Sequence, residues 1–243
     1  TLFGIPISNS LILSLITAFL LIGGGFLVVR SLKMVPGKAQ NSVETVLEGI
    51  LGFMGQTLGN KEQARKFFPL VATIFLFILL NNWIGVLPGI GSLGFFEPPS
   101  PEATASQGEK VFVPFFRSAN SDLNTTLALA LISVIAIQWY GIRKLGFLRH
   151  ISKFLVFTKG PINFFVGILE LIGEFAKVLS FSFRLFGNIF AGEVLLIIIM
   201  TLVPVIVPLP IIMMEFFVGF IQALVFAMLT LIFLKIATAE VEH

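Results

Sequence analysis

Five stretches of mainly apolar residues dominate the chain, and each is long enough to cross a membrane. About 20 apolar residues in helical form span the hydrocarbon core of a bilayer, and charged residues are rare within every stretch. The first stretch is too long for the apolar part of a signal peptide and no basic segment precedes it, so we expect a retained crossing. The pattern predicts an all-α integral membrane protein, a single membrane domain over 1–243, with crossings at 1–29, 67–90, 122–142, 161–203 and 211–239.

The last two stretches exceed the length that an upright crossing needs. A helix over 161–203 would measure about 64 Å at 1.5 Å per residue, against a hydrocarbon core about 30 Å thick. Either this helix is steeply tilted, or its first part runs outside the hydrocarbon. Pro161 fits the first turn of a helix, and prolines within 204–210 separate it from the last stretch. We therefore expect 161–203 and 211–239 to form a long, steeply tilted helical hairpin.

The segment 41–58 has a different pattern, with apolar residues at helical spacing and with Glu44 and Glu48 on the opposite side. A helix of this kind lies along a membrane surface, with its apolar face at the boundary of the hydrocarbon. The sequence therefore predicts an interfacial amphipathic helix in addition to the five crossings.

Basic residues in the connections predict the orientation. The connections 30–66 and 143–159 are rich in Lys and Arg, whereas the loop 91–121 holds only Lys110 and Arg117. The positive-inside rule assigns the basic connections to the inner side. We expect the N-terminus and the 91–121 loop outside, and the interfacial helix and the C-terminus inside.

Composition excludes several classes of function. The chain is 56% hydrophobic and 12% charged, which is too apolar for an ordinary water-soluble domain. Its net charge of +3 comes from basic residues at the ends of apolar runs, so the charge relates to topology and nucleic-acid binding is not expected. The chain has no cysteine, which excludes disulfides, thiol catalysis and cysteine-bound metals.

Arg184 interrupts the fourth crossing, where a positive charge at bilayer depth costs from about 3 to more than 10 kcal/mol. At 100° per residue, it shares a stripe about 80° wide with most other polar groups of this helix. Glu193 points to the opposite side. The stripe is expected to face water or charge, and its other members are Glu170, Glu174, Lys177, Phe181 and Asn188.

The last crossing carries a narrow stripe of its own, formed by Glu215, Gly219 and Gln222. If the hairpin turns near 203–204, residues at equal depth place Gln222 level with Arg184, and Glu215 level with Glu193. Structural alternatives remain open: a salt bridge for Arg184, one proton shared by the glutamates, and helix-to-helix hydrogen bonds for Asn188 and Gln222. We expect Lys177 to pair with Glu170 or Glu174, and His150 and His243 to be solvated.

The segments LSFSFRLFGNIFAGE and GFIQALVFAMLTLIFL, with NNWIGVLPG and SANSDLNTTLALAL, resemble subunit a of the F-type ATP synthase over nearly the whole chain. The resemblance implies that Arg184 is the essential stator arginine and that Asn188 and Gln222 are its polar neighbours. It assigns Glu193 and Glu215 to an outer half-channel. The acids of the inner half-channel would be Glu170 and Glu174, with Ser180 beside them.

The resemblance also implies the partners and the location. The partners would be a c-ring proteolipid oligomer, the peripheral-stalk subunit b, the rest of the ATP synthase complex and membrane lipid, with no nucleic acid, metal or cofactor. The ion moved between two half-channels past the arginine would be a proton or sodium, with a proton expected, and the ring sites that select it lie on another chain. The location would be a bacterial plasma (inner) membrane, with the C-terminus in the cytoplasm.

Two other classes of protein are weighed against this reading. A self-contained secondary ion transporter usually has inverted repeats and interrupted helices around a central site, whereas this chain has one asymmetric polar hairpin. An intramembrane hydrolase needs a nucleophile with a base, paired aspartates or a metal, and Asp122 is the only aspartate. Because no GxxxxGK loop occurs, any ATP chemistry would belong to other subunits.

Overall fold

The computed structural model describes residues 9–30, 33, 37–87, 94–97, 111–114, 118–147, 161–203 and 207–239. Within these ranges, five helices are long and apolar enough to cross a membrane, so the prediction of an all-α membrane protein is confirmed. They are α1 (Asn9–Arg30), α3 (Lys61–Val86), α4 (Leu123–Leu145), α6 (Pro161–Leu202) and α7 (Pro208–Thr238). His150 and His243, which were expected to be solvated, lie outside the described residues.

Three smaller features lie in the connections. Helix α2 (Lys38–Leu58) covers the predicted amphipathic segment. The connection 91–121, expected only as a loop, contains an antiparallel pair of strands, β1 (Gly94–Glu97) and β2 (Val111–Pro114). A single 3₁₀ turn, η2 (Ala119–Ser121), precedes α4.

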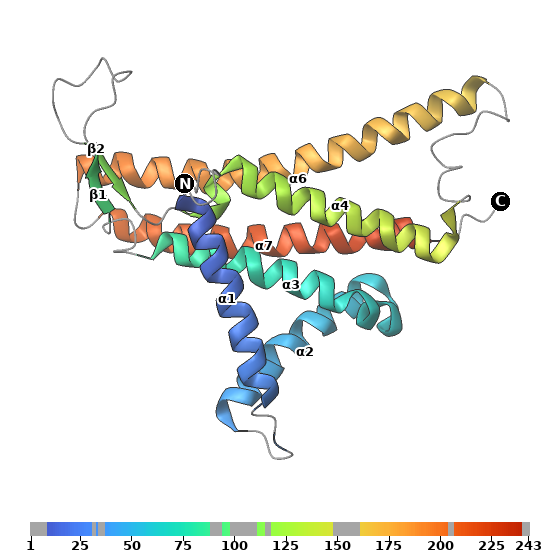
Figure 1. Cartoon of the computed structure of the whole chain (residues 1–243), viewed down its shortest axis with the longest axis horizontal. Coiled ribbons are helices and arrows are strands. Elements are labelled where there is room, and N and C mark those ends of the chain that lie inside the picture. The colour runs from blue at the N-terminus through green and yellow to red at the C-terminus, as the bar shows by residue number, and fades with distance from the viewer. Residues whose placement is uncertain are drawn as a thin grey trace.

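Four helices form the body of the molecule. Figure 1 shows α3, α4, α6 and α7 side by side along the long axis, and α1 crossing them at a large angle. Helix α7 contacts α3, α4 and α6, and α4 also packs on α6. The first part of α6 rises away from α4 and α7 (Figure 1), and most of its described side chains are exposed.

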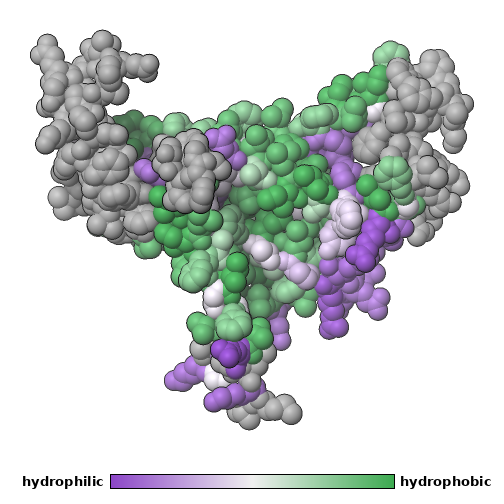
Figure 2. Space-filling model, viewed as in Figure 1, coloured by the Kyte–Doolittle hydropathy of each residue, from purple (hydrophilic) through white to green (hydrophobic). Residues whose placement is uncertain are grey.

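The interior is built from large apolar side chains on α3, α6 and α7. Phe181 of α6 lies between Phe226 and Phe233 of α7, with ring centroids 5.0 and 5.8 Å away. Apolar side chains also cover much of the outer surface (Figure 2). An apolar patch of this extent would be unstable in water but matches the hydrocarbon of a bilayer.

Buried amide side chains of α3 and η2 join the helices at one end of the bundle. Asn82 of α3 donates to the carbonyl oxygen of Gly219 on α7 at 2.9 Å and accepts from Asn120 of η2 at 2.7 Å. Thr17 of α1 donates to Asn81 at 3.1 Å. Polar groups buried in apolar surroundings need such partners, and these bonds therefore fix how α1, η2 and α7 meet α3.

Helix ends follow capping residues rather than the limits of the apolar runs. Helix α3 begins at Lys61, before the first apolar residue, because Asn60 accepts hydrogen bonds from the backbone N–H groups of Glu62 (2.9 Å) and Gln63 (3.3 Å). Gly59 ends α2 with a positive φ of 69°. The turn between α2 and α3 is thus only two residues long, and it brings the basic first turn of α3 against the end of α2.

Candidate functional site

Arg184 lies on the exposed side of α6. Its Nη2 donates to the hydroxyl oxygen of Ser180, one turn earlier, at 3.2 Å. Within the part of the chain that the structure describes, no carboxylate forms an ion pair with the guanidinium. An internal salt bridge, one of the alternatives for Arg184, is therefore not formed by the described residues.

A hollow of about 250 Å³ opens beside Arg184, between α6 and α7. Ser180 and Lys177 line it from α6, and Leu229 and Phe233 line it from α7. A volume of this size could hold several waters, since each takes up about 30 Å³ in the liquid. The guanidinium is thus placed at the edge of a space that can be wet.

Lys177 and Glu174 form an ion pair at this hollow, which confirms one of the two pairings predicted for the lysine. The Lys177 ammonium also lies 4.7 Å from the centre of the Phe233 ring, so it links α6 to α7. The second carboxylate oxygen of Glu174, Oε2, is buried with no partner in the described residues. Glu170 is exposed, on the part of α6 that leaves the bundle.

Asn188 and Gln222 join α6 to α7 on the other side of Arg184. The side-chain amide of Asn188 donates to Gln222 Oε1 at 2.6 Å, and Gln222 is buried. Gln222 thus bonds one helical turn beyond Arg184. The contact of Glu215 with Gly192, next to Glu193, agrees with the predicted level of the two glutamates.

Glu215 and Glu193 lie further along the hairpin. The Glu215 side chain rests directly against Gly192, where a Cβ atom would collide with its carboxylate. Both glutamates are half-buried, and they are close enough to interact electrostatically. The absence of a side chain at Gly192 therefore gives Glu215 its place beside the same turn of α6 that carries Glu193.

The polar groups fall into two sets separated by the arginine. Glu174 precedes Arg184 by about 15 Å along the helix axis, and Glu193 follows it by about 14 Å, at 1.5 Å per residue. Lys177 of the first set lines the hollow, and Glu215 of the second set lies one turn from Gly219, which accepts from the buried amide of Asn82. Asn82 is absent from the residues predicted from the sequence, although adjacent amides within an apolar run were a visible signal.

Fold and site together define a class of protein. It is an integral membrane protein with five long apolar helices, in which one exposed guanidinium divides two acidic sets along a helical hairpin.

Comparison with known proteins gives the family. A sequence model described as "ATP synthase A chain" matches residues 11–235, and the chain belongs to this family. Similar proteins include ATP synthase subunit a of Campylobacter jejuni subsp. jejuni serotype O:23/36 (strain 81-176), 34% identical over 89% of this chain and 84% of the relative. Another is ATP synthase subunit a of Geotalea daltonii, 38% identical over 91% of this chain and 83% of the relative. ATP synthase subunit a 1 of Pelobacter propionicus is 37% identical over 86% of this chain and 79% of the relative.

Proposed function

We propose that the chain is the proton-translocating stator subunit of the membrane sector of an F-type ATP synthase, facing a rotating ring of proteolipid subunits. The observation that carries this proposal is the placement of Arg184, which is exposed on a helix long enough to cross the membrane and has no described carboxylate partner. The names of the similar proteins support the same function.

The guanidinium of Arg184 would be stabilised by an anion on another chain. A charge at this depth is costly unless it meets an opposite charge or water, and the helix face that carries Arg184 is open. Gly187 on that face has open space around the position of a Cβ atom. A carboxyl group on a closely packed rotor helix would satisfy the charge, because small residues allow helices to approach in a membrane.

Two separate half-channels would lead to this carboxyl group. The hollow lined by Lys177 and Ser180 is the inner one. Glu174, paired with Lys177, and Glu170 lie towards the start of the helix. Glu193 and Glu215 form the outer one. Arginine separates the two because its guanidinium does not give up its proton in proteins, so a proton cannot pass directly from one half-channel to the other.

Rotation would follow from the cost of burying charge. A neutral carboxyl group on the rotor can face lipid, whereas a carboxylate cannot without a large desolvation penalty. Near Arg184 the anionic form is favoured, so the proton leaves through the inner half-channel. The next carboxylate takes up a proton through the outer one, and the ring turns to bring the neutral site into lipid. Each charge crossing the membrane contributes about 2.3 kcal/mol per 100 mV.

The lengths of the helices suggest how the chain sits in the bilayer. Helix α1 has 22 residues, about 33 Å, which matches an upright crossing of a core about 30 Å thick. Helix α6 has 42 residues and crosses α1 at a large angle (Figure 1). With α1 upright, α6 and α7 are steeply tilted. The basic connections 30–66 and 143–159 are proposed to face the cytoplasm of a bacterium, and the C-terminus lies on the same side. Subunit b is a further proposed partner.

Replacement of Arg184 tests this function. We expect Arg184→Ala to leave the complex assembled and to abolish coupled proton transport in membrane vesicles, because rotor carboxylates lose the charge that favours deprotonation. Arg30→Ala is the control, since Arg30 is also exposed and lies at the end of α1. Normal ATP-driven acidification by an assembled Arg184→Ala complex would refute the proposal. Glu215→Gln should slow transport without uncoupling it.

A further inference from the structure

A hollow outside the hairpin lies at the corner between α2 and α3. It has a volume of about 500 Å³, and Gly52, Gly55, Gly59, Lys61 and Arg65 line much of it. None of these residues belongs to the proposed proton pathway. A volume of this size is sufficient for a small ligand or for the headgroup of a lipid.

Two cationic side chains line the hollow from α3. Lys61 and Arg65 are four residues apart and therefore lie on one face of the helix. In the described part of the chain neither forms an ion pair with a carboxylate, although Glu48 also lines the hollow. Asn60 already accepts the N–H groups of Glu62 and Gln63, so an anion would be bound by the side chains rather than by the end of the helix.

The glycines of α2 keep the hollow open. A Cβ atom at Gly52 or at Gly59 would meet nothing within 4 Å, and one at Gly55 would lie 3.7 Å from Lys61 Cγ. Besides the polar side chains of Glu48 and Gln56, the rest of the lining is apolar and includes Leu51 and Ala64. Cationic side chains beside apolar ones suit an amphiphile better than a free ion.

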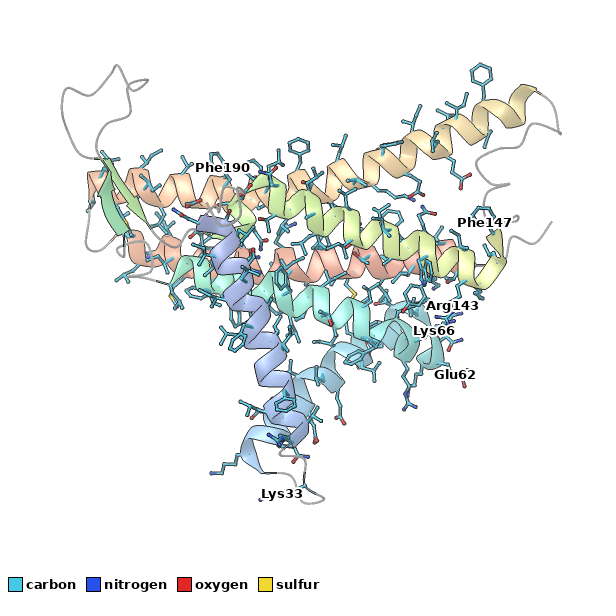
Figure 3. The ribbon with its side chains drawn as sticks, viewed as in Figure 1. Lys33, Glu62, Lys66, Arg143, Phe147 and Phe190 are labelled. Carbon is cyan, nitrogen blue, oxygen red and sulfur yellow. The ribbon has the colours of Figure 1, made fainter. Side chains whose placement is uncertain are left out.

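The position along α3 places the hollow at the membrane boundary. Apolar residues of α3 start at Phe67, half a turn after Arg65, so the two cations lie where lipid phosphates are found. Figure 3 shows Lys66 and Arg143 at the same end of the molecule, with Glu62 nearby. Hydrophilic side chains gather there (Figure 2). The site thus faces the leaflet to which the positive-inside rule assigns these residues.

We propose that this hollow binds the headgroup of an anionic phospholipid, with the phosphodiester between Lys61 and Arg65 and the start of an acyl chain against Leu51. Guanidinium and ammonium groups form charge-assisted hydrogen bonds to phosphate oxygens. The bound lipid would hold the interfacial helix α2 against α3.

Native mass spectrometry of the full chain, released from micelles with equal amounts of phosphatidylglycerol and phosphatidylcholine of the same acyl chains, tests the proposal. We expect retention of phosphatidylglycerol over phosphatidylcholine. The double variant Lys61→Gln/Arg65→Gln should lower this preference about tenfold or more, because two charge-assisted contacts are lost. Arg30→Gln/Lys33→Gln removes two basic residues elsewhere and should keep the preference.

A second variant tests the hollow without changing its charge. Gly52→Leu fills open space, so it should fold and yet lose the lipid, whereas Gly24→Leu on α1, where a Cβ atom also meets nothing, should retain it. Equal retention of the two lipids by the parent chain, or an unchanged preference in Gly52→Leu, would overturn the proposal. Displacement of phosphatidylglycerol by millimolar inorganic phosphate would also overturn it, because the hollow would then select a small anion rather than a lipid.

Discussion

The side-chain amide of Asn188 donates to Gln222 Oε1 at 2.6 Å, one turn of α6 beyond Arg184. This bond links α6 to α7 at the edge of the interior, since Asn188 is exposed and Gln222 is buried. Gln222 Nε2 is buried and has no hydrogen-bond partner among the described residues. The pair therefore fixes the distance between α6 and α7 and presents polar atoms next to the arginine.

Breaking this pair on one side should cost more than replacing both members. Asn188→Leu leaves both polar atoms of the Gln222 amide buried without a described partner, which costs about 1–3 kcal/mol. The double variant Asn188→Leu/Gln222→Leu removes the unpaired groups, so its melting temperature in detergent should recover towards that of the parent. A double-mutant cycle measures the coupling. Independent, additive effects of the two changes would show that the hydrogen bond does not link the helices.

Gly192 should be intolerant of even a methyl group, because its Cβ atom would collide with the Glu215 carboxylate. We expect Gly192→Ala to displace Glu215 and to slow proton transport in vesicles several-fold, while the helix itself gains propensity. The matched control is Gly24→Ala, which adds a methyl group in open space on α1. Equal transport rates for the two variants would show that the position of Glu215 beside α6 is not needed.

Asn82 should contribute more to stability than its neighbour Trp83. Asn82 is fully buried and bonds both Gly219 and Asn120, so Asn82→Ala leaves buried polar groups unpaired. The melting temperature should fall by roughly 2–10 °C. Trp83→Phe also loses a hydrogen bond, from Nε1 to the Phe216 carbonyl oxygen, but at an exposed position, and it should change stability little. A larger loss for Trp83→Phe would contradict this account of the buried amides.

The membrane helices could be predicted because a membrane crossing requires one local property of the sequence, an apolar run of sufficient length. Helix ends could not be predicted in the same way. Asn60 starts α3 several residues before the hydrocarbon boundary, since a side-chain cap acts on the backbone whether or not the next residues are apolar. The two short strands within 91–121 form by pairing with each other, which no single run of residues reveals.

The polar residues of the candidate site could be named from the sequence, but only some of their contacts could be predicted. Helical spacing alone gave the stripe of Arg184, and Lys177 does pair with Glu174. Spacing cannot find Gly192, because its importance depends on a side chain that arrives from α7. The hydrogen bond between Asn188 and Gln222 likewise joins side chains of two helices, so the spacing within one helix does not reveal it.

Gly187 provides a test of whether another chain covers the face of α6 that carries Arg184. Within the described structure a Cβ atom at Gly187 meets nothing within 4 Å, so Gly187→Leu should fold and keep the melting temperature of the isolated chain. If a rotor packs closely on this face, the added side chain should block rotation and lower proton transport by the assembled complex at least about tenfold, as overpacking disrupts close contacts. Phe183→Leu, also exposed on α6, removes volume instead and should be tolerated. Full transport by Gly187→Leu would place the rotor on another face of the molecule.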